Sequence, residues 1–251
     1  MTSIRGRHHN HIFTPLAEVP FAGHPAVGAA IYLLHHRRAA AAHTLRTKAG
    51  PVPFRAHALG GAPAAQLAVA HDVHVHDAPF AGTRHAAHPV VSIVKGMTAL
   101  LVRLPSLAAL AAQTANLLGN ENTYAAKDRL DAGWRAGPVV SYFYVDLGAD
   151  ADGVRRLRAR SWGSREDPAT GSMAAGLCAY LSLTEKEERV LVRRYEVTQG
   201  VEMGRRSEIR VRVTLDKEGK GVKEVLLEGN AVRVLEGKVP VPEVGMAVRS
   251  E

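Results

Sequence analysis

Two stretches of the chain carry the same order of small, apolar and polar positions, and both are typical of a turn followed by a helix. One reads Gly-His-Pro-Ala-Val-Gly-Ala-Ala-Ile-Tyr-Leu from residue 23, and the other reads Gly-Ser-Met-Ala-Ala-Gly-Leu-Cys-Ala-Tyr-Leu from residue 171. The helix-forming residues predict helices over about 26–36 and 172–183. A repeated unit of this kind predicts a chain with two pseudo-symmetric halves.

Short apolar or alternating segments fill most of the remaining chain and predict β-strands. Residues 90–94 and 139–145 are almost continuously apolar, as in buried strands, whereas 154–162 and 208–215 alternate between apolar and polar positions. Further strands are predicted at 12–14, 45–48, 51–56, 64–69, 100–105, 195–199, 222–229 and 231–237. A serine before an apolar stretch predicts a helix over 106–118.

These elements predict an α+β fold with mostly antiparallel sheets. With 251 residues, 46% of them hydrophobic, the chain is long enough for two units that each bury a core. We expect an N-terminal lobe at 1–105, a C-terminal lobe at 106–238 and a tail at 239–251. No apolar run reaches the roughly 18–20 residues that span a bilayer, and the first residues lack the apolar stretch of a signal peptide. We therefore expect no membrane partner and a cytoplasmic location.

The charge of the chain changes this picture only slightly. The formal net charge is +8, but the basic residues are scattered, and the densest group, at 205–212, alternates as in a strand with one solvated face. Only 5% of the residues are aromatic, which disfavours base stacking. We therefore expect attraction of small anions and no nucleic-acid partner. The single cysteine, Cys178, excludes an intrachain disulfide and is predicted to be a packed side chain.

The turn before each predicted helix carries groups suited to an anion. A helix N-terminus offers unpaired N–H groups and a partial positive charge. Gly23 and His24 at the first turn, and Gly171 and Ser172 at the second, are therefore candidate ligands for a substrate carboxylate. Asp167 could accept a hydrogen bond from the substrate. In the alternative interpretation, Asp167 or Ser172 only caps the second helix.

Histidine is the residue type best suited to proton exchange near neutral pH. The positive end of a helix favours the neutral imidazole, which can accept a proton or polarise a substrate. His24 is therefore a candidate catalytic residue, together with the carboxylate of Asp167.

A second histidine segment invites a metal interpretation. Residues 71–77 read His-Asp-Val-His-Val-His-Asp, and His74 and His76 would share one face of a strand. A zinc site requires three or four converging ligands, and the spacing offers no further cluster. We therefore expect no metal, and a polar loop or edge strand in this segment.

Three motifs resemble the PhzF-like family of phenazine biosynthesis, whose fold is that of diaminopimelate epimerase. Residues 12–30 are similar to the family's strand, turn and Gly-His-Pro helix. Residues 166–176 resemble its Asp-Pro-x-Thr-Gly-Ser signature, and 195–205 resemble its Gln-Gly-x-x-Met-Gly-Arg stretch. The resemblance extends from about residue 11 to residue 238.

The resemblance implies two lobes, each a sheet wrapped around a central helix, with the substrate between the two helix N-termini. It also implies isomerisation without a cofactor or metal, in which a proton leaves carbon and returns elsewhere on the same molecule. In such an enzyme Gly23 and His24 form the first cradle, Asp167 is a polar active-site carboxylate, and Gly171 and Ser172 hold the substrate's carboxylate. A homodimer is a common assembly in this family.

The sequence departs from the family pattern in one respect. Members normally carry, before the Phe-Thr-Pro strand, a segment with a Gly-Asn-Pro helix and a Ser-Glu-Thr stretch whose glutamate is the main proton shuttle. No part of this sequence matches that segment, so we expect an incomplete first lobe. Two functions stay open: an isomerase for a small carboxylate, or a protein that binds a carboxylate without turnover.

Overall fold

The structure is a computed structural model that describes residues 3–4, 7–37, 43–185 and 190–237. The predicted tail at 239–251 lies outside these residues. Most of the strands form one sheet with the order β1-β2-β5-β6-β7-β16-β15-β14-β12-β11-β10-β9-β8, and β13 adds to β12. The first part of this path contains β1 (Ser3–Ile4), β2 (Arg7–His9), β5 (Thr44–Thr47), β6 (Gly50–Leu59) and β7 (Ala62–Ala68).

The remaining strands of the path are β8 (His74–Val75), β9 (Val90–Val94), β10 (Met97–Arg103), β11 (Val139–Ala149), β12 (Val154–Trp162), β13 (Glu166–Asp167), β14 (Val192–Gln199), β15 (Ser207–Leu215) and β16 (Val222–Gly229). Apart from this sheet, β3 (Ile12–Phe13) and β4 (Glu18–Val19) form a small hairpin. The helical segments are α1 (Gly23–Ile31), η1 (Tyr32–His36), α2 (Leu107–Ala111), η2 (Asn120–Asn122), η3 (Ala125–Arg129) and α3 (Gly171–Thr184).

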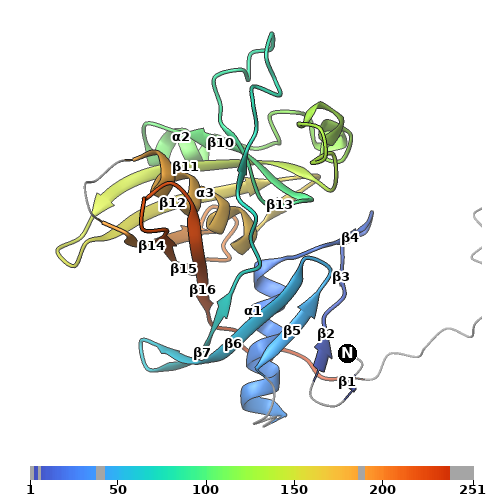
Figure 1. Cartoon of the computed structure of the whole chain (residues 1–251), viewed down its shortest axis with the longest axis vertical. Coiled ribbons are helices and arrows are strands. Elements are labelled where there is room, and N and C mark those ends of the chain that lie inside the picture. Colours follow the sequence, from blue (N-terminus) through green and yellow to red (C-terminus); the bar gives the residue numbers. More distant parts are fainter. Residues whose placement is uncertain (1–2, 5–6, 38–42, 186–189, 238–251) are drawn as a thin grey trace, which may run out of the picture.

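The sheet curves around two helices and so forms two lobes (Figure 1). The lower lobe holds α1 with β1, β2, β5, β6 and β7, and the upper lobe holds α3 with β8 to β15. Strand β16 joins the lobes because it pairs with β7 on one edge and with β15 on the other. Most neighbouring strands are antiparallel, but β2 with β5, β10 with β11, and β12 with β14 are parallel. The α+β class predicted from the sequence is confirmed.

Both predicted helices are present, and both begin at the first glycine of the repeat, which is three residues earlier than predicted for α1 and one residue earlier for α3. In α1 the buried residues recur at the spacing of an amphipathic helix, and a π-helix, η1, continues it to His36. In α3 all residues from Gly171 to Leu177 are buried, as expected for a helix enclosed by the sheet. Cys178 is fully buried in α3, and burial raises the pKa of its thiol well above the usual value. The prediction of a packed cysteine is confirmed.

Two predicted elements differ from the structure. The helix predicted at 106–118 ends at Ala111, although the Ser106 hydroxyl accepts the backbone N–H of Ala109 at 3.1 Å as a helix cap. Beyond it, Asn116 bonds to the backbone of Val139 and Leu118, and such side-chain bonds compete with helix formation. The strand predicted at 231–237 is wrong: the segment has no regular structure, and its apolar side chains Val232, Val234 and Leu235 are exposed. An alternating pattern forms a strand only beside a partner strand.

The strand pairing also places residues 90–103. The lobe boundary predicted after residue 105 would put these residues in the N-terminal lobe. In the structure β9 pairs with β10, and β10 pairs in parallel with β11. A Cβ atom on Gly176 of α3 would lie 3.7 Å from Cβ of Ile93 on β9, so these strands pack against the helix of the upper lobe.

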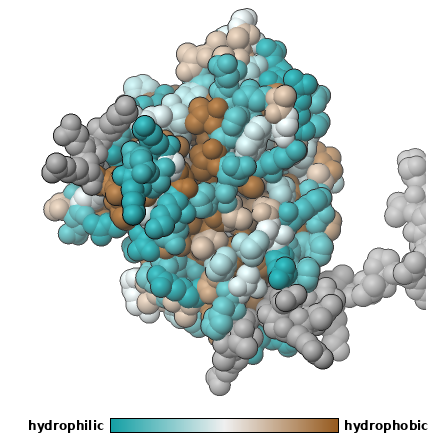
Figure 2. Space-filling view, in the orientation of Figure 1, coloured by the Kyte–Doolittle hydropathy of each residue, from teal (hydrophilic) through white to brown (hydrophobic). Residues whose placement is uncertain are grey.

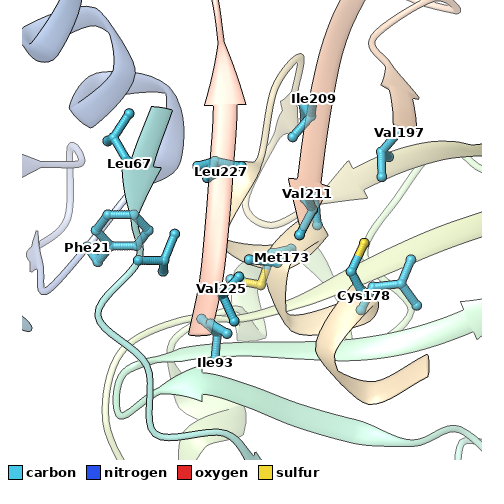
Figure 3. Packing of buried hydrophobic residues seen from close by; sticks show 14 of the residues in the cluster. Phe21, Leu67, Ile93, Met173, Cys178, Val197, Ile209, Val211, Val225 and Leu227 are labelled. Carbon is cyan, nitrogen blue, oxygen red and sulfur yellow. The ribbon is translucent and has the colours of Figure 1, made fainter. Parts of the chain in front are cut away.

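The hydrophobic core runs through both lobes. Figure 3 shows Val225 and Leu227 on β16 between Phe21 and Leu67 of the lower lobe and Met173 of α3. All of these side chains are at most 1% exposed. On the outside, Figure 2 shows hydrophilic side chains over most of the face, with hydrophobic ones among them toward its middle. Within the described residues, no helix is both long enough and apolar enough to cross a membrane.

Candidate active site

The N-termini of α1 and α3 meet at two glycines. A Cβ atom on Gly23 would lie 2.6 Å from Cα of Gly171, and a Cβ atom on Gly171 would lie 3.1 Å from Cα of Gly23. Leu227 on β16 packs against both positions, at 3.0 Å from each of these hypothetical atoms. A side chain on Gly23 would force the backbones apart, and one on Gly171 would press against Leu227 and the Gly23 backbone. Helix N-termini carry unpaired N–H groups, so this close approach brings the free N–H groups of both helices near one another.

Neither helix N-terminus is closed by a side chain in this structure. The residue before α1 is Ala22, and the residue before α3 is Thr170; neither makes a side-chain capping bond. The hydroxyl of Thr170 instead donates to Oδ2 of Asp167 at 2.7 Å. The alternative in which Asp167 or Ser172 caps α3 is therefore not the arrangement observed. The first turns of both helices can receive an external acceptor.

The position of His24 is fixed by a bond between the two repeats. Its Nδ1 lies 2.7 Å from the carbonyl oxygen of Ala169, and because a carbonyl only accepts, Nδ1 carries the proton. In the neutral ring the lone pair is then on Nε2. The same Nδ1 lies 3.9 Å from Oδ1 of Asp167. The structure thus brings together the two predicted catalytic residues, which are 143 positions apart in the sequence (167 − 24).

Gln199 holds the loop that carries Asp167. Its Nε2 donates to the carbonyl oxygen of Asp167 at 2.6 Å and to the Thr170 hydroxyl at 3.1 Å. Its Oε1 accepts the backbone N–H of Thr170 at 3.2 Å and the hydroxyl of Tyr142 at 3.1 Å. Burial raises the pKa of Tyr142 well above its usual value, so its hydroxyl remains a donor. Gln199 is fully buried and uses its whole amide in this network.

A cleft of about 650 Å³ lies between the two lobes, beside the first turns of α1 and α3. Gly23, His24, Asp167 and Ser172 are on its surface, as predicted, and Ser172 is only 1% exposed. Gly171 is not among the lining residues; it lies against Gly23 where the helices cross. The opposite wall comes from the β3–β4 hairpin and from Tyr124, whose hydroxyl lies 2.8 Å from the Thr14 hydroxyl.

The charges around the cleft favour an anion. Arg165 and Arg205 line it, and within the described residues neither forms an ion pair. Glu166 also lines it, but both of its oxygens accept bonds from Arg160, at 2.7 and 2.9 Å. Among the acidic residues that line the cleft, Asp167 is the one without a basic partner other than His24.

Sequence reasoning missed two contributors to this site. Gln199 and Arg205 both occur in the stretch that carries the third family motif, but the spacing alone gave them no role. A buried glutamine before a glycine in a predicted strand is the signal that could have pointed to Gln199, since a buried amide requires hydrogen-bond partners.

The structure also completes a group that the sequence left incomplete. His74 and His76, outside the cleft, lie beside Asp131, and one candidate ligand atom from each residue lies within 4.8 Å of the others. The sequence offered no third ligand because Asp131 follows the histidines by more than fifty residues. β8, which carries His74, is the last strand of the sheet path, so the prediction of an edge strand is confirmed.

A comparison with protein families adds the decisive observation. Residues 2–237 match the profile of the PhzC-PhzF family, described as phenazine biosynthesis-like protein. This chain belongs to the PhzC-PhzF family. The resemblance inferred from three motifs is thereby confirmed.

Relatives of this PhzC-PhzF protein include trans-2,3-dihydro-3-hydroxyanthranilate isomerases. The Pseudomonas chlororaphis protein is 31% identical over 215 residues, which are 78% of this chain and 66% of the relative. That of Pseudomonas aeruginosa is 30% identical, over 90% of this chain and 77% of the relative. A PhzF-family structure from Bacillus anthracis has a TM-score of 0.68 at 21% identity and covers 93% of this chain and 80% of that chain, so it shows the fold. The chain spans about two thirds of the length of the first of these relatives.

Proposed function

We propose that this protein is an isomerase that moves a proton within a small carboxylate-bearing metabolite, using its own side chains and no cofactor. The supporting observation is the contact of His24 with the loop of Asp167. The bond from Nδ1 of His24 to Ala169 fixes the tautomer and leaves Nε2 as a base in an open cleft. Family membership and the isomerases among the relatives support the reaction class.

The substrate carboxylate fits the end of the cleft where the two helices begin. In this proposal the N–H groups of Gly171 and Ser172 donate to the carboxylate, and the partial positive charge of α3 favours it. Gly23 and His24 offer the corresponding groups of α1. Arg165 and Arg205 raise the positive potential at the cleft and attract the anion from solution.

The proton transfer uses His24 as base and then as acid. Nε2 of the neutral ring removes a proton from the carbon next to the activating group, which leaves a delocalised carbanion and an imidazolium. Asp167, 3.9 Å from Nδ1, stabilises the imidazolium by its negative charge. The imidazolium then returns the proton to another carbon of the same molecule, so the atoms and the charge balance. A positioned group of this kind contributes roughly 10²–10⁴ to a rate.

Deuterium exchange tests this proposal. We expect NMR in D₂O to show deuterium at carbon when the protein is incubated with trans-2,3-dihydro-3-hydroxyanthranilate, the substrate named for the relatives. The His24→Asn and Asp167→Asn variants should each lose roughly 10²–10⁴ in exchange rate. His35→Asn, an exposed histidine at the far end of the same helical segment, is the matched control and should be unchanged. Equal rates in all three variants would contradict the proposed roles.

One observation favours a second candidate function, binding without turnover. Besides Asp167, Glu166 is the acidic residue that lines the cleft, and its ion pair with Arg160 removes it as a free acid or base. If a second proton-transferring carboxylate is required, the cleft would bind a carboxylate and not isomerise it. Saturable binding by calorimetry, with no deuterium uptake by any candidate substrate, would support this function over the isomerase.

Assembly and location remain predictions. We propose a homodimer because large apolar side chains are exposed on the β3–β4 hairpin, where Phe13 is 71% and Leu16 is 69% exposed. Light scattering coupled to size exclusion should give twice the mass of the chain, and a monomer at all concentrations would contradict it. We likewise expect a cytoplasmic location and no nucleic-acid partner.

A further inference from the structure

We propose that His74, His76 and Asp131 bind a divalent transition-metal ion of the zinc class, and that the ion fastens β8 to the loop at Asp131. We call these three residues the His-His-Asp cluster. They lie outside the cleft and take no part in the proposed proton transfer. Two imidazoles and one carboxylate are ligands that zinc and related ions prefer, and three protein ligands leave a position for water.

The geometry of the cluster is close to that of a metal site. Oδ2 of Asp131 lies 2.7 Å from Nε2 of His74 and 3.6 Å from Nδ1 of His76. Ligand atoms around one tetrahedral ion with bonds of about 2.0–2.1 Å are about 3.4 Å apart. The longest separation within the cluster is at most 4.8 Å, so only a small inward movement is needed. His74 can make this movement, because it lies on the short edge strand β8 and its side chain is 32% exposed.

His76 is held in the protonation state that ligates a metal. The backbone N–H of Asp131 donates to Nδ1 of His76 at 3.3 Å, so the ring proton is on Nε2. Nε2 donates to the Ser92 hydroxyl at 2.9 Å, and Ser92 is in turn 2.7 Å from the Thr98 hydroxyl. A ligating histidine commonly donates its second N–H to such a partner, which orients the ring. The lone pair on Nδ1 now accepts the backbone N–H of Asp131, 3.6 Å from Oδ2 of that residue, and an ion bound there would replace this bond.

The two imidazoles are also oriented by an aromatic ring. Trp134 stacks on His74, with ring centroids 4.5 Å apart and an interplanar angle of 7°, and it meets His76 edge-on at 6.0 Å. Trp134 thus orients both rings before any ion binds, which reduces the entropy lost on binding.

The charge of the cluster calls for a cation. Within the part of the chain that the structure describes, no lysine or arginine forms an ion pair with Asp131, whose oxygens contact only the two histidines and the backbone N–H of Asp77. A divalent ion would compensate this carboxylate. An ion bound at Nε2 of His74 would replace the bond from this ring to Asp131, and the ring proton would move to Nδ1.

A metal titration of the untagged full chain, freed of metal by a chelator that is then removed, tests the proposal. We expect one Zn²⁺ per chain by calorimetry. Co²⁺ in its place should give the visible absorption of a four- or five-coordinate ion. His74→Ala and Asp131→Asn should weaken Zn²⁺ binding at least about tenfold, and Ser92→Ala roughly tenfold through the orientation of His76.

The control variant is His57→Ala, which removes an exposed histidine on β6 that pairs with Glu228 and is not part of the cluster. It should bind Zn²⁺ as the wild type does. Zn²⁺ should raise the midpoint of thermal unfolding of the wild type and of this control, but not that of His74→Ala. The proposal is overturned if no single site is found, if His74→Ala and Asp131→Asn bind as tightly as the wild type, or if His57→Ala weakens binding equally.

Discussion

Gly23 and Gly171 contact each other through their backbones where the first turns of α1 and α3 cross. A methyl group on Gly23 would lie 2.6 Å from Cα of its counterpart, closer than nonbonded atoms approach. The glycine that opens each copy of the repeat is therefore required by contact between the copies. The second glycine of each copy is not, since nothing lies within 4 Å of a Cβ atom on Gly28 and only ordinary contacts surround one on Gly176.

This difference gives the first prediction. Gly23→Ala should lower the free energy of unfolding by about 1–3 kcal/mol, because the added methyl group forces the helices apart. Gly28→Ala is the matched control in the same helix and should raise stability by about 0.5–1 kcal/mol, since alanine is the better helix former. Urea unfolding followed by circular dichroism measures both. A Gly23→Ala variant as stable as the wild type would show that the two backbones are not in contact.

Gln199 does not line the cleft, but we expect it to contribute strongly to the free energy of unfolding. Gln199→Leu leaves the backbone N–H of Thr170, the carbonyl of Asp167 and the Tyr142 hydroxyl without their partner. We expect a loss of at least about 2 kcal/mol in unfolding free energy. Tyr142→Phe removes only one of these bonds and should cost about 1 kcal/mol. If chemical denaturation gave the same loss of unfolding free energy for both variants, the central role of Gln199 in this network would be contradicted.

Arg205 should contribute to the capture of an anionic ligand. Arg205→Gln is expected to raise the dissociation constant of a small carboxylate roughly tenfold, with the largest effect at low salt. The adjacent Arg206 is engaged with Glu208 at 2.6 Å and does not line the cleft, so Arg206→Gln is the control with the same change of charge. Calorimetry at two ionic strengths makes the comparison. If both variants weaken binding equally, only the net charge of the chain matters.

The interaction of Asp146 with Arg155 should make the stability of the protein depend on pH. The hydrogen bond with Arg155 lowers the pKa of the Asp146 carboxyl below the usual value, so the unfolded chain binds the proton more readily than the folded one. The stabilisation is therefore complete above about pH 4, the value of an unfolded aspartate, and is lost as the pH falls through the lower folded value.

The corresponding variant is Asp146→Asn. It should be about 1–3 kcal/mol less stable than the wild type at neutral pH, and the gap should narrow below about pH 4. Asp128→Asn, whose side chain is 75% exposed, is the control and should follow the wild type. Thermal unfolding across this pH range is the measurement. A gap that widens in acid would contradict the assigned ion pair.

The sequence by itself determined the local elements. The two helix-forming repeats lie at residues 23 and 171 as predicted, and strands β9, β12 and β16 have the predicted bounds. Local patterns sufficed here because helix periodicity and strand alternation are recorded in neighbouring residues. Family membership also followed from three short motifs. The same reasoning failed at 231–237, where an alternating pattern has no partner strand, and at 106–118, where Asn116 competes for the backbone.

Only the tertiary structure decided which residues meet. Nothing in the sequence places the carbonyl of Ala169 beside His24, Gln199 beneath the Asp167 loop, or Asp131 beside His74 and His76. These contacts join residues separated by tens of positions or more, and they depend on the order of strands in the sheet. That order is set by the burial of whole faces and not by local pattern. The turns, and through the family resemblance their meeting at one site, could therefore be predicted from the sequence, whereas the contacts that hold the cleft together and the cluster outside it could not.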